Sequence, residues 1–119
     1  MSTMFSSYET SVALRDAGAP QGDGSNHHWR VPGEFDVPPF APWLGTYRSR
    51  TADVRAFRAD EIIESIRADG AHAVDIEDDD EWVVRIYSYG VCRRPYEHES
   101  LVEALAAAWL AVLREARRG

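Results

Sequence analysis

Apolar residues recur at helical spacing in three stretches of the chain, at about 8–17, 59–70 and 100–116. The first is expected to begin after a capping serine, Ser6 or Ser7, and to end at the glycine and proline that follow. The second carries acidic residues in its first turn, where the helix dipole favours negative charge. Its pattern predicts a helix of about three turns.

The stretch 100–116 predicts the longest helix. Ser100 and Glu103 are spaced as a capping box, and arginines at the other end suit the negative pole of the helix dipole. Apolar residues cover about half of the circumference, which is more than the single stripe of a surface helix. Two explanations stay open: the rest of the chain covers this helix, or it packs on a second copy in a homodimer.

Alternation of apolar and polar residues predicts two strands at 72–76 and 82–89, joined as a hairpin through Asp78–Glu81. One face of the second strand carries Trp82, Val84 and Ile86, and the other carries Val83, Arg85, Tyr87 and Tyr89. Shorter strands are predicted at Trp29–Val31 and around Thr46–Arg50.

After the first of these short strands, residues 32–47 hold four prolines, which exclude a regular helix or a central strand. They also hold Phe35, Phe40, Trp43 and Tyr47, whereas disordered linkers are poor in aromatic residues. We therefore predict an ordered loop laid over the core. The whole chain, 1–119, is expected to form one α+β domain, a small antiparallel sheet with helices packed on it, in the order α-β-loop-α-β-β-α.

Charge and composition narrow the function classes. The net charge is −7, and residues 58–119 carry eight arginines against fourteen acidic residues, so free nucleic acid is excluded as a direct ligand. A basic protein partner fits this balance. No apolar run approaches the roughly 20 residues that span a bilayer, and no signal peptide opens the chain. The single cysteine, Cys92, fits a reducing compartment, so a cytoplasmic location is expected.

Six carboxylates fall within the seven positions 75–81. A calcium loop requires alternating oxygen donors around a central glycine, which this run lacks, and no phosphate-binding loop accompanies it for magnesium. Mimicry of nucleic acid requires carboxylates spread over a whole face. The solvated turn of a hairpin is the favoured interpretation, with contact to a partner protein through Asp78, Asp79 and Asp80 as the alternative. No metal and no cofactor is predicted.

The histidines and Cys92 give no catalytic pattern. His27 and His28 are adjacent, so they point to opposite sides of an extended segment. His72, His98 and Cys92 are scattered, without the short-range pairs of zinc sites. Cys92 lies near arginines that favour a thiolate, and His98 is its nearest candidate base in sequence. A structural thiol is the simpler interpretation.

Arginines and tyrosines gather at the second strand of the predicted hairpin. Both residue types anchor protein interfaces, because each combines large contact area with directional hydrogen bonds. The candidate partner-binding residues are Arg85, Tyr87, Tyr89, Arg93, Arg94 and Tyr96. The alternative is that the aromatic loop from Phe35 to Tyr47 covers this face.

Three phrases resemble a loose group of small phage and prophage proteins of unknown function. They are "LRDAGAPQG" (Leu14–Gly22), "ADEIIESI" (Ala59–Ile66) and "ESLVEALAAAWLAVL" (Glu99–Leu113). The resemblance covers about half of the chain and leaves out the proline-rich middle and the acidic run. It implies a phage or mobile-element origin and carries over no catalytic residue.

The sequence therefore favours a non-enzymatic protein-binding or accessory protein, of phage or mobile-element origin, that acts on a host factor. The alternative is a small-molecule binder or minor enzyme with a pocket between the hairpin and the proline-rich loop. Its candidate lining residues are Trp29, Trp43, Arg85, Cys92 and His98.

Overall fold

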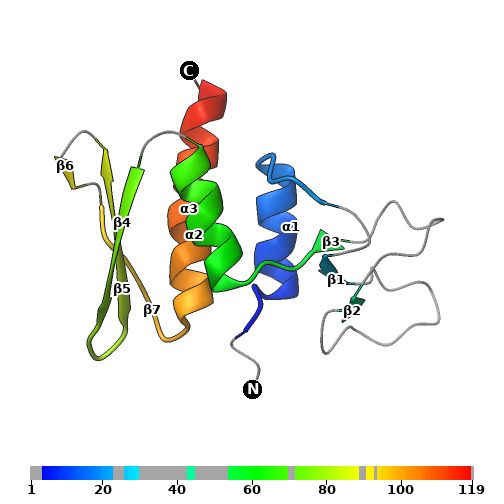
Figure 1. Ribbon diagram of the computed structural model, residues 1–119, viewed down its shortest axis with the longest axis horizontal. Helices are drawn as coiled ribbons and strands as arrows, with labels where there is room; N and C mark the ends of the chain where they lie inside the picture. Colours follow the sequence, from blue (N-terminus) through cyan, green and yellow to red (C-terminus); the bar gives the residue numbers. More distant parts are fainter. Residues whose placement is uncertain are drawn as a thin grey trace.

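Three helices separate two small antiparallel sheets in the computed structural model, which describes residues 4–22, 26–29, 43–44, 54–69, 72–88, 91–92 and 94–118 (Figure 1). The smaller sheet lies beside α1 at one end of the molecule, and the larger sheet lies beside α2 and α3 at the other. The predicted α+β class is confirmed, with additional short strands.

Helix α1 spans Tyr8–Asp16, as predicted, and both of its ends are capped. The hydroxyl of Ser7 accepts the backbone N–H of Thr10. At the other end Gly18 has a φ of +103°, and backbone N–H groups return to the carbonyls of Arg15 and Leu14. This is a Schellman motif, in which glycine adopts the left-handed conformation at little cost.

The smaller sheet has the strand order β2-β1-β3. Strand β1 spans His27–Trp29, β2 spans Trp43–Leu44 and β3 spans Val54–Arg55. The strand predicted at Trp29–Val31 therefore begins earlier. Of the proline-rich stretch 32–47, only β2 is described, and it forms an edge of this sheet. The rest of that stretch and the strand predicted at Thr46–Arg50 lie outside the described residues.

Helix α2 spans Ala59–Ala68, as predicted, and carries Asp60 and Glu61 in its first turn. The carboxylate of Glu61 accepts the backbone N–H of Arg58, which satisfies one of the donors left open at a helix start. Ile62 and Ile66 are fully buried.

The larger sheet contains the predicted hairpin. Strand β4 (His72–Asp78) pairs antiparallel with β5 (Trp82–Ser88) over its full length. On its other side β5 pairs with β6 (Val91–Cys92) and with β7 (Tyr96–His98). Helices α2 and α3 pack on one face of this sheet, which leaves the opposite face toward solvent.

An extra residue lies between β6 and β7. Tyr87 pairs with Cys92 and Val84 pairs with Tyr96, so three steps along β5 correspond to four along the other chain segment. A single extra residue is a β-bulge, and it reverses the face to which the following side chains point. Cys92 therefore shares the solvent face with Tyr87, whereas Tyr96 points toward α3.

Helix α3 spans Leu101–Arg118 and lies at the centre of the molecule, in contact with α1, α2, β5 and β7. Trp109 and Leu105 are fully buried, and the Trp109 ring meets Phe57 edge to face at a centroid distance of 4.8 Å. Its wide apolar circumference is covered by the elements of one chain, while Leu101, Leu110 and Leu113 stay half-buried. Covering within the chain accounts for the pattern, and a homodimer through 100–116 stays a prediction.

None of the helices in the described ranges combines the length and the apolar character needed to cross a bilayer.

Candidate functional site

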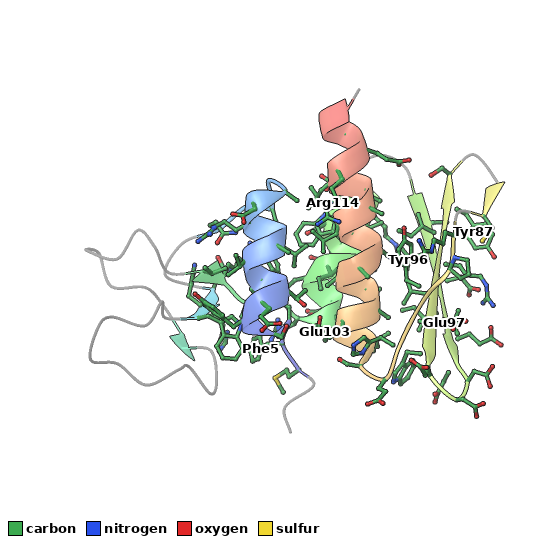
Figure 2. The ribbon with its side chains drawn as sticks, turned by 180° about the vertical axis from the view of Figure 1, so that it is seen from behind. Phe5, Tyr87, Tyr96, Glu97, Glu103 and Arg114 are labelled. Atoms are coloured by element: carbon green, nitrogen blue, oxygen red, sulfur yellow. The ribbon has the colours of Figure 1, made fainter. Side chains whose placement is uncertain are left out.

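The face of the larger sheet that is turned away from α2 and α3 is called the outer face here. The β4–β5 and β5–β7 registers place residues of four strands on it. They are Ala73, Asp75, Glu77, Val83, Arg85, Tyr87, Cys92 and Glu97. Figure 2 shows Tyr87 and Glu97 on this side of the sheet and Tyr96 on the side of α3.

Arg85 occupies the middle of the outer face. Its Nη1 donates to Oε2 of Glu77 at 2.8 Å and lies 3.8 Å from Oδ2 of Asp75. The hydrogen bond with Glu77 raises the pKa of the Arg85 guanidinium above its ordinary value. All three side chains stay partly exposed, so Arg85 presents a fixed cation between two accessible carboxylates.

Tyr87 lies beside Arg85 and directly opposite Cys92. Loss of hydration around the half-buried phenol, followed by the neighbouring Cys92, raises the pKa of Tyr87 above its ordinary value. Tyr87 therefore stays a neutral hydrogen-bonding phenol across the physiological range. The two predicted partner-binding residues of β5 that the structure describes, Arg85 and Tyr87, are thus brought together on one solvent-facing surface.

The acidic run forms the turn of the hairpin, as predicted. Strand β4 ends at Asp78 and β5 begins at Trp82, with a backbone hydrogen bond of 3.1 Å from Asp79 to Glu81 within the turn. All six carboxylates of residues 75–81 are exposed. Among the described residues, no three acidic, histidine or cysteine side chains are grouped so as to hold a metal ion.

Together the outer face and the turn form a surface that we call the acidic face. It carries seven acidic side chains and one arginine, Arg85, among the described residues. The acidic members are Asp75, Glu77, Asp78, Asp79, Asp80, Glu81 and Glu97. Val83, predicted on this side, is nevertheless buried, because it lies on the central strand between Glu77 and Glu97.

The other predicted partner-binding residues are placed differently. Tyr96 faces the helices, and Arg94 borders a hollow on the same side, next to α3, so neither extends the outer face. Tyr89 and Arg93 lie outside the described residues. The aromatic loop considered as a cover is described only at β2, which belongs to the smaller sheet, across the helices from β5 (Figure 1).

Cys92 and His98 do not form a catalytic pair. They lie opposite Tyr87 and Trp82, at the two ends of β5, which places their backbones about 16 Å apart. His98 instead accepts the backbone N–H of Ser100 through Nδ1. Cys92 and His98, the nucleophile and base that are close in sequence, are thus kept apart because their partners on β5 are five residues apart.

The ring nitrogens of His28 are also occupied. His28 is buried, and its Nδ1 and Nε2 lie 3.0 Å and 2.9 Å from the carbonyl oxygens of Asn26 and Gln21. The ring of the neighbouring His27 contacts that of Phe5 in a tilted arrangement, at a centroid distance of 4.7 Å. The two histidines point to different sides of β1, as predicted, and His28 serves the packing of the smaller sheet.

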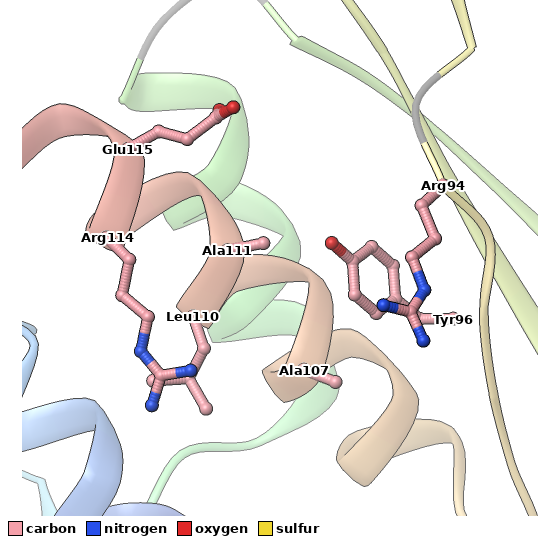
Figure 3. A pocket seen from close by; sticks show the side chains of 7 residues that line it. All are labelled: Arg94, Tyr96, Ala107, Leu110, Ala111, Arg114 and Glu115. Carbon is pink, nitrogen blue, oxygen red and sulfur yellow. The ribbon is translucent and has the colours of Figure 1, made fainter. Parts of the chain in front are cut away.

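A groove of about 530 Å³ lies between α3 and the segment that leads into β7 (Figure 3). Ala107, Leu110 and Ala111 supply its apolar surface, Arg94 and Tyr96 border it on the strand side, and Arg114 and Glu115 on the helix side. Sequence reasoning missed this groove. The small residues Ala107 and Ala111, one helical turn apart, were its local signal.

A second hollow of about 360 Å³ lies near the start of α3, where Met4, Trp82 and Leu101 are among its lining residues. Neither hollow includes any of the residues predicted to line a pocket between the hairpin and the proline-rich loop. Trp29 belongs to the smaller sheet and donates its indole N–H to the carbonyl of Ser6, whereas Arg85 and Cys92 lie on the outer face.

No family model, no curated protein and no solved structure matches this chain, so a function can be argued only from its own residues.

Proposed function

We propose that this chain is a non-enzymatic protein-binding protein that captures a basic partner through the acidic face. The observation that carries the proposal is the exposure of seven carboxylates on the hairpin turn and on the outer face that also carries Arg85 and Tyr87, in a four-stranded sheet. Exposed carboxylates attract a basic partner and accelerate its encounter, while Tyr87 and Arg85 supply contact area and directional hydrogen bonds.

The proposal extends to the origin and setting of the protein. From the three sequence phrases we infer a phage or mobile-element origin, with a host factor as the partner, and the single cysteine, Cys92, favours a cytoplasmic location. The acidic face supports a host factor as the partner through its charge. Many host proteins that bind nucleic acid carry basic surfaces, and these would be attracted to it.

Capture of partners from host lysate on immobilised protein tests the proposal. Asp79→Arg in the turn is compared with Glu64→Arg, an equal change of charge at an exposed position of α2. We expect Asp79→Arg and a triple reversal of Asp78–Asp80 to lose a partner that Glu64→Arg retains. Raising the salt concentration should weaken capture by the wild type, because exposed charges are screened.

Truncation of the aromatic and cationic residues tests the outer face itself. Tyr87→Ala and Arg85→Ala should each reduce capture while far-ultraviolet circular dichroism stays unchanged, because both side chains are only half-buried. If the same partner binds equally well to the turn reversals and to both truncations, the acidic face is not its binding surface and the proposal fails.

Small-molecule binding, the second candidate function, is supported by a groove other than the predicted one between the hairpin and the proline-rich loop. The groove beside α3 combines two guanidinium groups and a phenol with an apolar wall, which suits an anion that carries an apolar body. Ala111→Leu fills this groove without altering the acidic face. Partner capture that survives Ala111→Leu but not Asp79→Arg supports binding of the partner at the acidic face. Capture that survives Asp79→Arg but not Ala111→Leu supports binding at the groove.

A further inference from the structure

Strand β4 forms an open edge of the larger sheet. It pairs with β5 along all seven of its residues, and no other strand of the described chain pairs with it. An edge strand presents a row of backbone N–H and C=O groups that lack sheet partners. Seven residues of strand extend over about 23 Å, which is long enough to guide a second strand into register.

The inner side of this edge carries apolar side chains that are incompletely covered. Val74 and Ile76 pair with Ile86 and Val84, which are fully buried, yet both β4 residues are only half-buried. Ile63 on α2 is half-buried as well and packs against the same core. A strand added beside β4 would cover these side chains on their open side. Apolar side chains on the inner side of the added strand would become buried at the same time.

The outer side of the same edge is acidic. Asp75 and Glu77 alternate with Val74 and Ile76 and are more than half exposed. Charges of like sign directly across a strand pair destabilise it, so pairing of β4 with a second copy of itself is disfavoured. Charges of opposite sign stabilise such a pair, so a strand with basic residues on its outer side is favoured.

We propose that the β4 edge accepts an extended segment of the partner protein as an additional strand. The segment alternates basic residues, which lie beside Asp75 and Glu77, with apolar residues, which cover Val74 and Ile76. Backbone hydrogen bonds supply affinity in this mode, and the alternating side chains supply specificity. This inference rests on the proposed function, because the acidic face is its outer side.

A synthetic heptapeptide of alternating lysine and valine is the probe. Its control has the same composition in two blocks, so that charge and apolarity are retained and the alternation is lost. We expect the alternating peptide to bind roughly ten-fold more tightly than the block peptide, because only it satisfies both sides of the edge. A third peptide, methylated on alternate backbone nitrogens of the edge that would face β4, should lose this advantage.

Hydrogen exchange followed by NMR locates the bound strand. On addition of the alternating peptide, every second amide of β4 should exchange more slowly, while amides of α1 stay unchanged. Asp75→Lys combined with Glu77→Lys should abolish binding of the lysine peptide and create binding of a glutamate–valine peptide. Equal affinity for the alternating and block peptides, or unprotected β4 amides at saturation, would overturn the inference.

The outcomes separate this inference from the proposed function. A captured partner that needs Asp79 and Tyr87 but leaves the β4 amides unprotected overturns strand addition and leaves the acidic face as a binding surface. Protection of β4 amides that grows with the concentration of the protein alone would identify a second copy as the occupant and overturn the inference.

Discussion

The indole Nε1 of Trp109 donates a hydrogen bond of 3.0 Å to Oδ2 of Asp69, a residue forty positions earlier that caps the end of α2. Trp109 is fully buried and is the largest such side chain of the described core. The bond therefore fixes the direction of the central indole and joins α3 to the end of α2. Trp109→Glu would therefore disrupt this core.

Removal of the acceptor should destabilise the protein. Asp69→Ala leaves the Trp109 N–H without its partner, and we expect a loss of about 1 to 2 kcal/mol in the free energy of unfolding. Asp69→Asn keeps an acceptor oxygen and should cost less than half as much. Urea denaturation followed by tryptophan fluorescence measures both. Equal stability of Asp69→Ala and wild type would show that water replaces the carboxylate.

Ser6 is expected to be the most sensitive small residue of the N-terminal segment. Its fully buried hydroxyl accepts the backbone N–H of Phe57 at 3.0 Å and contacts the Ser11 hydroxyl at 2.8 Å. Ser6→Ala orphans the Phe57 N–H, while the Ser11 hydroxyl keeps the backbone carbonyl of residue 6, and this substitution should cost about 2 kcal/mol. Ser11→Ala keeps the bond to Phe57 and should cost about 1 kcal/mol. Thermal unfolding of the two variants measures which is less stable. A Ser11→Ala variant less stable than Ser6→Ala would contradict this account.

Glu103 holds the start of α1 from the first turn of α3. Its carboxylate accepts the backbone N–H of Ser7 at 2.8 Å and the hydroxyl of Thr10 at 2.6 Å. Glu103→Ala should destabilise the protein by about 2 kcal/mol, and Glu103→Gln by less, because the amide oxygen still accepts one bond. Hydrogen exchange at the α1 amides should increase in Glu103→Ala before global unfolding. Unchanged exchange at these amides would mean that the Ser7 cap alone is enough to hold the start of α1.

The same residue shows what local sequence patterns omit. Ser100 and Glu103 were predicted to form a capping box, but only the Ser100 hydroxyl contributes, through a 3.4 Å contact with the Glu103 N–H. The Glu103 side chain instead reaches residues more than ninety positions away in sequence. Spacing of three residues identifies the local partner, and it contains no information about a distant one that competes for the same carboxylate.

The helices and the hairpin were predictable because each repeats its period over many residues. Strands β6 and β7 were not, because two or three residues carry no detectable alternation. The extra residue between them reverses the direction of Tyr96, which sequence reasoning grouped with Arg85 and Tyr87. Such a bulge is specified by the pairing with β5, and the adjacent Pro95 was its only local sign.

Tyr87 provides a prediction at alkaline pH. Because loss of hydration and the neighbouring Cys92 raise its pKa, this tyrosine should lose its proton at higher pH than ordinary tyrosine. Ultraviolet titration of tyrosinate absorbance, with Tyr87→Phe subtracted from wild type, isolates it from the other four tyrosines. A group whose pKa is higher in the folded than in the unfolded state contributes stability that is complete below the unfolded pKa. That contribution is lost as the pH rises through the folded pKa.

Two further variants should move this titration in opposite directions. Cys92→Ala removes a neighbour that raises the pKa of Tyr87, so it should lower that pKa without restoring the ordinary value, because the loss of hydration remains. Arg85→Ala removes a neighbouring positive charge and should raise the pKa of Tyr87 further. Shifts in the same direction for both variants would show that the titration follows a general change in structure, and that Cys92 and Arg85 do not act on Tyr87 through their charges.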